Sequence, residues 1–314
     1  MHYRRLGESG LKVSVVSLGS WLTFGNAVDD KPARECVFAA LEAGVNYFDT
    51  ADVYARGAAE QFLGRALKGT RREELVLGTK VFGRMSDDVN DAGLSRKHVF
   101  ESVERSLRRL ETEYIDLYQC HRYDPETPLP EVVRAMDDLI RQGKVLYWGV
   151  SCWTAAQLRE ACEVADRLRA PRPISNQPPY NLLQREIEAE VLPTSKELGL
   201  GQLVYSPLAQ GVLTGKYLGG AVPPESRLAD DKLNKFMKDL LGAEHQARVE
   251  ALRGIAAELG VALPALALAW CLRDPGVSSV ITGSTRPEQV RANLAAAELV
   301  LSAETLARIE AVLA

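Results

Sequence analysis

Residues 115–150, IDLYQCHRYDPETPLPEVVRAMDDLIRQGKVLYWGV, carry the pattern that decides the fold. Two apolar runs, at 115–120 and 145–150, stand at its ends, and such runs are typical of strands covered on both faces. Between them lies a helix candidate, residues 129–141, which Gly143 ends. The segment therefore predicts a strand, a helix and a second strand, the repeating unit of a parallel sheet.

The same unit repeats along the chain. Successive predicted strands end 27 to 40 residues apart, except for one interval of 77 residues before the last strand. Eight such strands predict one α/β domain over residues 1–314, a (β/α)8 TIM barrel with a long loop, 206–243, after the seventh strand. An open doubly wound sheet is the alternative, but no G-x-G-x-x-G motif follows the first strand. The other predicted strands are 13–18, 47–49, 75–80, 174–177, 202–205 and 279–282, and the other predicted helices are 31–43, 95–110 and 154–169.

Two terminal segments complete this prediction. Residues 3–15 contain Gly7 and Gly10 between polar and apolar residues, which favours a hairpin that closes the barrel floor. Residues 302–313 follow a Ser302 cap with apolar side chains at helical spacing, which predicts a C-terminal helix on the outside of the barrel.

The composition excludes several classes of protein. With 38 basic and 42 acidic residues the net charge is −4, so no broad positive surface for nucleic acid or an anionic membrane is expected. The five cysteines form no C-x-x-C pair and the four histidines no H-E-x-x-H motif, so we expect free thiols and no metal site. No apolar stretch approaches about 18 residues, and residues 1–10 lack a signal-peptide core, so a cytoplasmic protein without membrane insertion is expected.

Polar residues follow three of the predicted strands where the active site of such a barrel forms. These residues are Asp49, Lys80 and His121, and Tyr54 follows Asp49 by five positions. Taken singly, they have ordinary structural roles as a helix cap, a surface charge, a rim histidine and a packed ring. Taken together, they form a chain of groups that handle protons, in which Asp49 keeps Lys80 charged and Lys80 favours the phenolate of Tyr54. Tyr54 is then expected to exchange a proton near physiological pH, while His121 orients a carbonyl oxygen.

Three motifs at these positions resemble the aldo-keto reductase superfamily: DTADVY at 49–54, LGTK at 77–80 and LYQCHR at 117–122. The resemblance covers nearly the whole chain and implies a catalytic tetrad of Asp49, Tyr54, Lys80 and His121, with Tyr54 as general acid. It also implies reduction of an aldehyde or ketone by NADPH, with a small carbonyl compound as substrate.

Three further segments resemble the parts of that family that hold a nicotinamide dinucleotide without a Rossmann motif: NQPPYNLLQRE at 176–186, VYSPLAQGVLTGKY at 204–217 and ITGSTRPEQVRANL at 281–294. The resemblance implies that Ser20, Trp21 and Asp49 lie near the nicotinamide ribose, that Ser151 and Gln177 hold the carboxamide, and that Tyr205 stacks on the ring. It places Ser206, Pro207, Leu208, Gly211 and Lys216 along the pyrophosphate, and Gly283, Thr285, Arg286, Gln289 and Asn293 around the adenosine.

Arg286 favours NADP(H) over NAD, because a guanidinium binds a 2′-phosphate in bidentate fashion. The sequence departs from the best-known branch of the family, which has a lysine and an arginine where Gly283 and Gln289 stand. The substrate pocket is expected to be lined by Tyr54, His121 and four aromatic residues, Trp21, Phe24, Phe82 and Trp153, although these four are equally suited to capping the core.

Two other functions remain open. Residues 93–107, 130–144 and 206–217 resemble the branch that contains potassium-channel β-subunits, which implies an NADP(H)-binding regulatory subunit of a membrane channel. The familiar channel subunits of that branch have asparagine at the position of His121, which favours a working reductase. In a third interpretation Lys80 forms a Schiff base, as in an aldolase, but its pairing with Asp49 disfavours the free amine. The chain is also compatible with a homo-oligomer.

Overall fold

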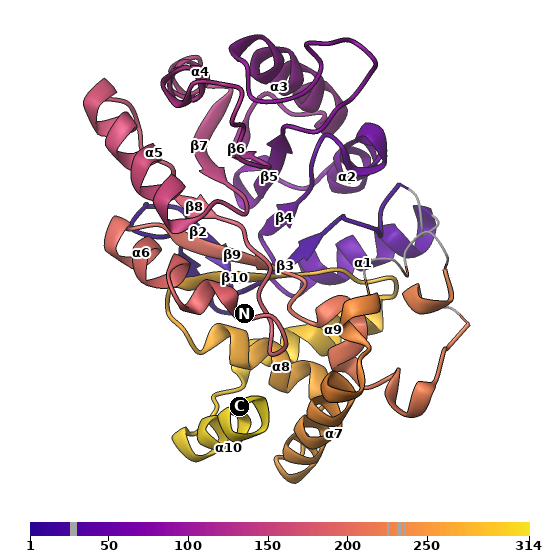
Figure 1. The fold of residues 1–314 in the computed structure, drawn as a ribbon. Coiled ribbons are helices and arrows are strands. Elements are labelled where there is room, and N and C mark those ends of the chain that lie inside the picture. The colour runs from indigo at the N-terminus through magenta and orange to yellow at the C-terminus, as the bar shows by residue number, and fades with distance from the viewer. Residues whose placement is uncertain (26–29, 225, 231–233, 235–236) are drawn as a thin grey trace.

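The computed structural model describes residues 1–25, 30–224, 226–230, 234 and 237–314. Parallel strands close into a barrel in the order β10-β3-β4-β5-β6-β7-β8-β9 (Figure 1), so the predicted (β/α)8 fold is confirmed. Every pair of neighbours in this barrel is parallel, which places all the carboxyl ends of the strands at one rim. The strands are β3 (Val16–Gly19), β4 (Tyr47–Asp49), β5 (Val76–Val81), β6 (Ile115–Cys120), β7 (Val145–Val150), β8 (Ser175–Asn176), β9 (Gly201–Tyr205) and β10 (Val277–Thr282).

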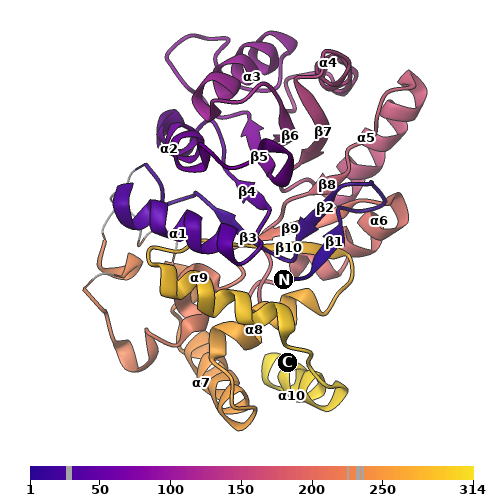
Figure 2. The same ribbon diagram turned by 180° about the vertical axis from the view of Figure 1, so that it is seen from behind.

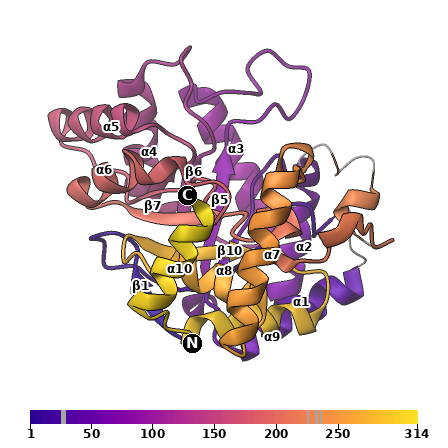
Figure 3. The same ribbon diagram turned by 60° about the horizontal axis from the view of Figure 1, so that its bottom comes forward.

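Helices surround the barrel, as Figures 1 and 2 show from opposite sides. The long interval before β10 contains two helices, α7 and α8, preceded by 3₁₀ segments that include Ala209–Thr214, Leu218–Gly220 and Arg227–Ala229. The C-terminal helix α10 packs beside α7 (Figure 3). The helices are α1 (Asp30–Glu42), α2 (Ala58–Leu67), α3 (Arg96–Leu110), α4 (Leu129–Arg141), α5 (Ala155–Leu168), α6 (Val191–Leu198), α7 (Ala243–Glu258), α8 (Leu263–Leu272), α9 (Pro287–Leu294) and α10 (Ala303–Leu313).

Side-chain caps set where several helices begin. The Ser95 hydroxyl accepts a hydrogen bond from the backbone N–H of His98 at the start of α3, and Ser302 does the same for α10. Thr154 forms a capping box with Gln157 at the start of α5, which satisfies two backbone groups at once. These caps confirm the predicted helix starts to within one residue.

The predicted strand at 13–18 forms as two strands instead of one, because the chain changes partner at Val15. Residues 12–14 form β2 (Lys12–Ser14), which pairs antiparallel with β1 (Tyr3–Arg5), while β3 joins the barrel. The backbone N–H of Val15 donates to the His2 carbonyl, beside the hairpin, at 3.0 Å. The backbone carbonyl of Val15 accepts from the N–H of Val280, in the barrel, at 2.9 Å. The hairpin lies against the amino end of the barrel (Figure 2), where Leu6 and Val13 are fully buried.

The interior of the barrel is divided into two layers. Toward the floor, Leu6 and Val13 pack with inward-facing apolar residues that include Leu117 and Leu203. Nearer the carboxyl rim, the buried side chains become polar, with Asp49, Lys80, Gln119 and Gln177 all within 3% of complete burial. This polar layer is where the candidate site forms.

None of the described helices is by itself both long enough and apolar enough to cross a membrane. Only α7 and α8 taken together meet that criterion, and they are bent by 94° at their junction. All five cysteines are free thiols, four of them buried and Cys152 half-buried.

Candidate active site

A buried ion pair forms the base of the candidate site. Lys80, near the end of β5, is fully buried, and its ammonium donates to Asp49 Oδ2 and to the Thr50 carbonyl, both at 2.7 Å. Asp49 ends β4, the neighbour of β5, so the two side chains come from adjacent strand ends. Buried charges persist in proteins when they are paired and hydrogen-bonded in this way.

Two further donors hold the Asp49 carboxylate in place. Its Oδ1 accepts from the Gln177 amide at 2.8 Å and from the Tyr47 hydroxyl at 3.0 Å. Gly78 makes the Tyr47 contact possible, since a Cβ at Gly78 would stand 2.5 Å from the Tyr47 hydroxyl. The sequence analysis did not single out Tyr47 or Gly78, because this contact depends on the register of β4 against β5.

Tyr54 and His121 complete the cluster. The Tyr54 hydroxyl lies 3.2 Å from Lys80 Nζ, at the start of the 3₁₀ segment Tyr54–Gly57. His121 directly follows β6, and its ring meets the Tyr54 ring edge-on with 5.6 Å between centroids. The structure therefore brings Asp49, Tyr54, Lys80 and His121 together at one rim, as the strand-end argument predicted.

The electrostatics assign a protonation state to three of these groups. Burial lowers the pKa of Lys80, but the charge of Asp49 and the bonds to Asp49 and Tyr54 outweigh it, so the pKa is raised and Lys80 stays charged. Burial raises the pKa of Tyr54, and the opposing effect of Lys80 is smaller, so the net shift is upward. Burial and the charges of Lys80 and Arg122 lower the pKa of His121 to about 2, so its ring is neutral.

The Tyr54 result corrects one expectation. Lys80 does favour the phenolate, but removal of the ring from water costs the phenolate more, so the pKa does not move toward neutrality. Tyr54 is therefore a protonated phenol that holds a proton available for donation. The adjacent ammonium is placed to stabilise the phenolate that donation leaves behind.

The nicotinamide end of the expected cofactor site has unused hydrogen-bonding capacity. The side-chain amide N–H of Gln177 donates to Asp49, and the side-chain carbonyl oxygen, Oε1, has no partner among the described residues. The Ser151 hydroxyl donates to the Gln177 backbone carbonyl at 2.8 Å and accepts from Arg122 at 3.5 Å, which leaves one lone pair as an acceptor. Both acceptors suit the N–H groups of a carboxamide. Ser20 is buried, with its hydroxyl bonded to Thr50 at 2.9 Å, and Tyr205 is half-buried at the end of β9.

The segments expected to contact the pyrophosphate and the adenosine follow neighbouring strands, since β9 pairs with β10. The loop after β9 contains Ser206 and Gly211 with φ of +53° and +97°, and a Cβ at Gly211 would meet Lys216 Nζ at 3.2 Å. Close backbone approach beside a cation suits a diphosphate. In the loop after β10, Thr285 donates to Gln289 and Arg286 is exposed at the start of α9. Of the remaining residues expected here, Pro207, Leu208 and Gly283 lie on the same two loops, and Asn293 is buried within α9.

Arg227 is a cation that the sequence analysis missed. It lies in the 3₁₀ segment Arg227–Ala229, and one guanidinium nitrogen donates to Gln210 while another reaches within 3.5 Å of a Cβ position at Gly283. Arg227 therefore bridges the two loops that the cofactor is expected to contact. No local pattern marked it, because the loop-rich insertion has no periodicity.

Two of the four aromatic residues that were expected to line the substrate pocket are buried in the hydrophobic core instead. Phe24 is 2% exposed and packs on Phe62 with 4.9 Å between ring centroids. Trp153 is also 2% exposed and packs edge-on against Tyr123 at 5.0 Å. Their burial corrects the assignment to an open pocket wall. Trp21 and Phe82 are half-buried and remain candidates.

Comparison with known proteins agrees with this geometry. Residues 15–314 match the sequence profile described as "Aldo/keto reductase family". The chain therefore belongs to the aldo/keto reductase family. Among its relatives, a "Probable voltage-gated potassium channel subunit beta" of Oryza sativa subsp. japonica is 46% identical over 317 residues, covering 99% of this chain and 96% of the relative. A protein of the same description from Arabidopsis thaliana is 46% identical over 318 residues, covering 100% of this chain and 97% of the relative.

Proposed function

We propose that the protein reduces an aldehyde or ketone to an alcohol with NADPH. The observation that carries this proposal is the position of the Tyr54 hydroxyl, 3.2 Å from a buried ammonium that Asp49 holds at 2.7 Å. A phenol that is protonated, with a cation ready to stabilise its conjugate base, is a general acid suited to a carbonyl oxygen.

In the proposed reaction the bound dinucleotide supplies a hydride to the carbonyl carbon. Tyr54 donates its proton to the carbonyl oxygen, and Lys80 stabilises the phenolate that results. Asp49 keeps Lys80 charged throughout, because the two are buried together. The neutral ring of His121, edge-on to Tyr54, hydrogen-bonds the carbonyl oxygen and orients it.

The residues fit the cofactor as follows. Ser151 and Gln177 hold the carboxamide through their free acceptors. Lys216, beside Gly211, and Arg227, bonded to Gln210, provide positive charge for the pyrophosphate. Arg286, exposed at the start of α9, binds the 2′-phosphate and makes the cofactor NADP(H).

Replacement of Tyr54 by Phe tests the acid. Tyr54→Phe removes one oxygen and keeps the ring that packs against His121. We expect turnover of a carbonyl substrate to fall by about a hundredfold or more, which is the usual contribution of general acid catalysis. NADPH affinity, measured by titration of its fluorescence, should stay near wild type. Retained turnover would remove Tyr54 from the acid role, and lost affinity would show that the substitution disturbs the site as a whole.

The names of the two plant relatives favour a second proposal, a cofactor-binding subunit of a membrane channel. The two functions are distinguished by one pair of measurements on the wild-type protein: NADPH-dependent turnover over a panel of carbonyl compounds, and co-purification with a channel. Negligible turnover together with a stable channel complex would favour the subunit.

A further inference from the structure

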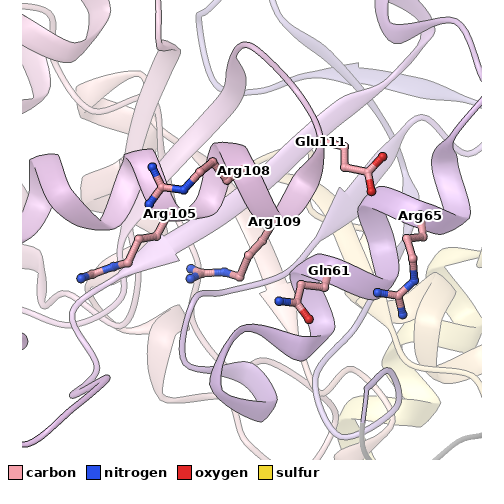
Figure 4. A pocket seen from close by; sticks show the side chains of 6 residues that line it. All are labelled: Gln61, Arg65, Arg105, Arg108, Arg109 and Glu111. Atoms are coloured by element: carbon pink, nitrogen blue, oxygen red, sulfur yellow. The ribbon is translucent and has the colours of Figure 1, made fainter.

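A hollow of about 490 Å³ lies on the outer wall of the barrel between α2 and α3. None of its residues belongs to the proposed active site. Figure 4 shows the side chains that line it, which include four arginines and one acid. This concentration of cations contrasts with the net charge of −4 for the whole chain. The lining residues are Gln61, Arg65, Arg105, Arg108, Arg109 and Glu111.

Two of the arginines are each held in place by a carboxylate and still have N–H groups without a partner. Arg109 donates through Nε to the buried carboxylate of Glu60 at 2.6 Å, and Arg105 donates through Nη2 to Asp91 at 2.6 Å. Each guanidinium has five N–H groups. Nη1 of Arg105 and Nη1 of Arg109 have no partner in the described part of the chain.

Each of the other three arginines faces a carboxylate, so the excess positive charge of the hollow comes from Arg108. Arg108 is exposed and makes no ion pair with any acid in the ranges that the structure describes. Arg65 is 3.6 Å from Asp30, a loose pair between two exposed side chains. The one acid of the lining, Glu111, is instead paired with Lys68 at 3.5 Å.

Packing keeps Arg109 from turning away. A Cβ at Gly57 would stand 2.8 Å from both Cδ and Nε of Arg109, so the side chain lies directly under the Gly57 backbone. Gly57 has φ of +91° and stands just before α2. Because Arg109 is already ordered, a ligand that it binds pays little of the entropy of ordering a long side chain.

We propose that this hollow binds a phosphate group, either of a small soluble phosphate compound or of a lipid headgroup. Planar guanidinium groups match phosphate oxygens in bidentate fashion, and several of them together suit a ligand with more than one negative charge. A monovalent carboxylate would satisfy fewer of the free N–H groups on Arg105, Arg108 and Arg109.

Calorimetric titration with inorganic pyrophosphate tests the site in the full chain, and comparison of wild type with a variant of the hollow separates its binding from binding elsewhere. Arg108→Ala is the informative variant, because Arg108 is exposed and supports no described ion pair, so folding should be unaffected. The matched control is Arg167→Ala, which removes an exposed arginine near the end of α5. Saturable binding should weaken by about tenfold in Arg108→Ala, the loss expected for one charge-assisted hydrogen bond, and stay unchanged in Arg167→Ala.

Absence of saturable heat up to about 5 mM pyrophosphate, or equal affinity of Arg108→Ala and wild type, would overturn the proposal. Because Arg108 is no part of the proposed cofactor site, this result does not depend on that site. Sedimentation with phosphatidylcholine vesicles containing about 5% phosphatidylinositol 4,5-bisphosphate distinguishes the two sources of phosphate. Vesicle binding that Arg108→Ala abolishes assigns a lipid headgroup, and pyrophosphate binding without vesicle binding assigns a soluble compound.

Discussion

The charge pair inside the barrel gives a prediction about stability that needs no cofactor or substrate. Lys80→Met removes the ammonium and keeps most of the buried stem. Lys80 is fully buried, and its loss leaves the Asp49 carboxylate without the cation 2.7 Å away. Removal of one partner from a buried ion pair typically costs about 3–5 kcal/mol of unfolding free energy. We expect a loss in this range for Lys80→Met.

A second substitution tests the cause. In Lys80→Met the Asp49 carboxylate stays buried without its cation. Asp49→Asn removes that negative charge and keeps an oxygen that can accept from Gln177 and Tyr47. The double variant should therefore be more stable than Lys80→Met alone, although it carries one more change. Residues in contact show such coupling in double-mutant cycles. The four proteins are compared by urea unfolding, followed by both tryptophan fluorescence and circular dichroism.

The control is a lysine in an exposed pair. Lys144 bonds Glu104 on the surface, where both side chains are about a third or more exposed. Lys144→Met should cost less than about 1 kcal/mol, as exposed pairs do. If Lys80→Met also costs less than that, or if the losses of the two single variants simply add, the buried pair is not the source of stability that we infer.

Three further predictions concern titration and cofactor choice. Burial and the charge of Glu60 raise the pKa of Asp52 to about 7, so the stability it contributes is complete below its unfolded pKa, near 4, and is lost as pH rises through 7. As the pH is raised from 5 to 8, the Tm of wild type should therefore fall by more than the Tm of Asp52→Asn. Plots of Tm against pH that run parallel for the two proteins would contradict this. The His121 ring should stay neutral, so its Cε1 NMR signal should not move between pH 8 and 5, whereas a midpoint near 6.5 would show an ordinary histidine. Arg286→Ala should raise the KM for NADPH far more than the KM for NADH, and equal effects would remove Arg286 from the 2′-phosphate.

The barrel could be predicted because its signals are local. Strand runs, helix caps such as Ser95 and Thr154, and the spacing of the units all lie within a few tens of residues. The change of partner at Val15 could not be predicted in this way. Its N–H bonds to His2 and its C=O to Val280, and an apolar run contains no information about which distant segment pairs with each half.

The candidate site was predictable to the same extent. Asp49, Lys80 and His121 each interrupt or follow an apolar strand, and the barrel topology alone brings such strand ends to one rim. The protonation of Tyr54 was not predictable, because it depends on how much burial opposes the charge of Lys80. Arg227 was missed for a related reason, since only the fold shows that a residue of the insertion reaches Gly283.

The polar layer that carries the site has an energetic consequence for the rest of the barrel. Gln119 Nε2 is buried without a partner among the described residues, and such a group costs roughly 1–3 kcal/mol. The rim half of the interior therefore contributes less to stability than a fully apolar barrel would. The apolar cluster at the floor, where the hairpin places Leu6 and Val13 against Leu117, offsets this cost. Leu6 and Val13 belong to the hairpin segment, which carries none of the residues of the proposed chemistry, so substitutions at these two positions should change stability without changing the geometry at the rim.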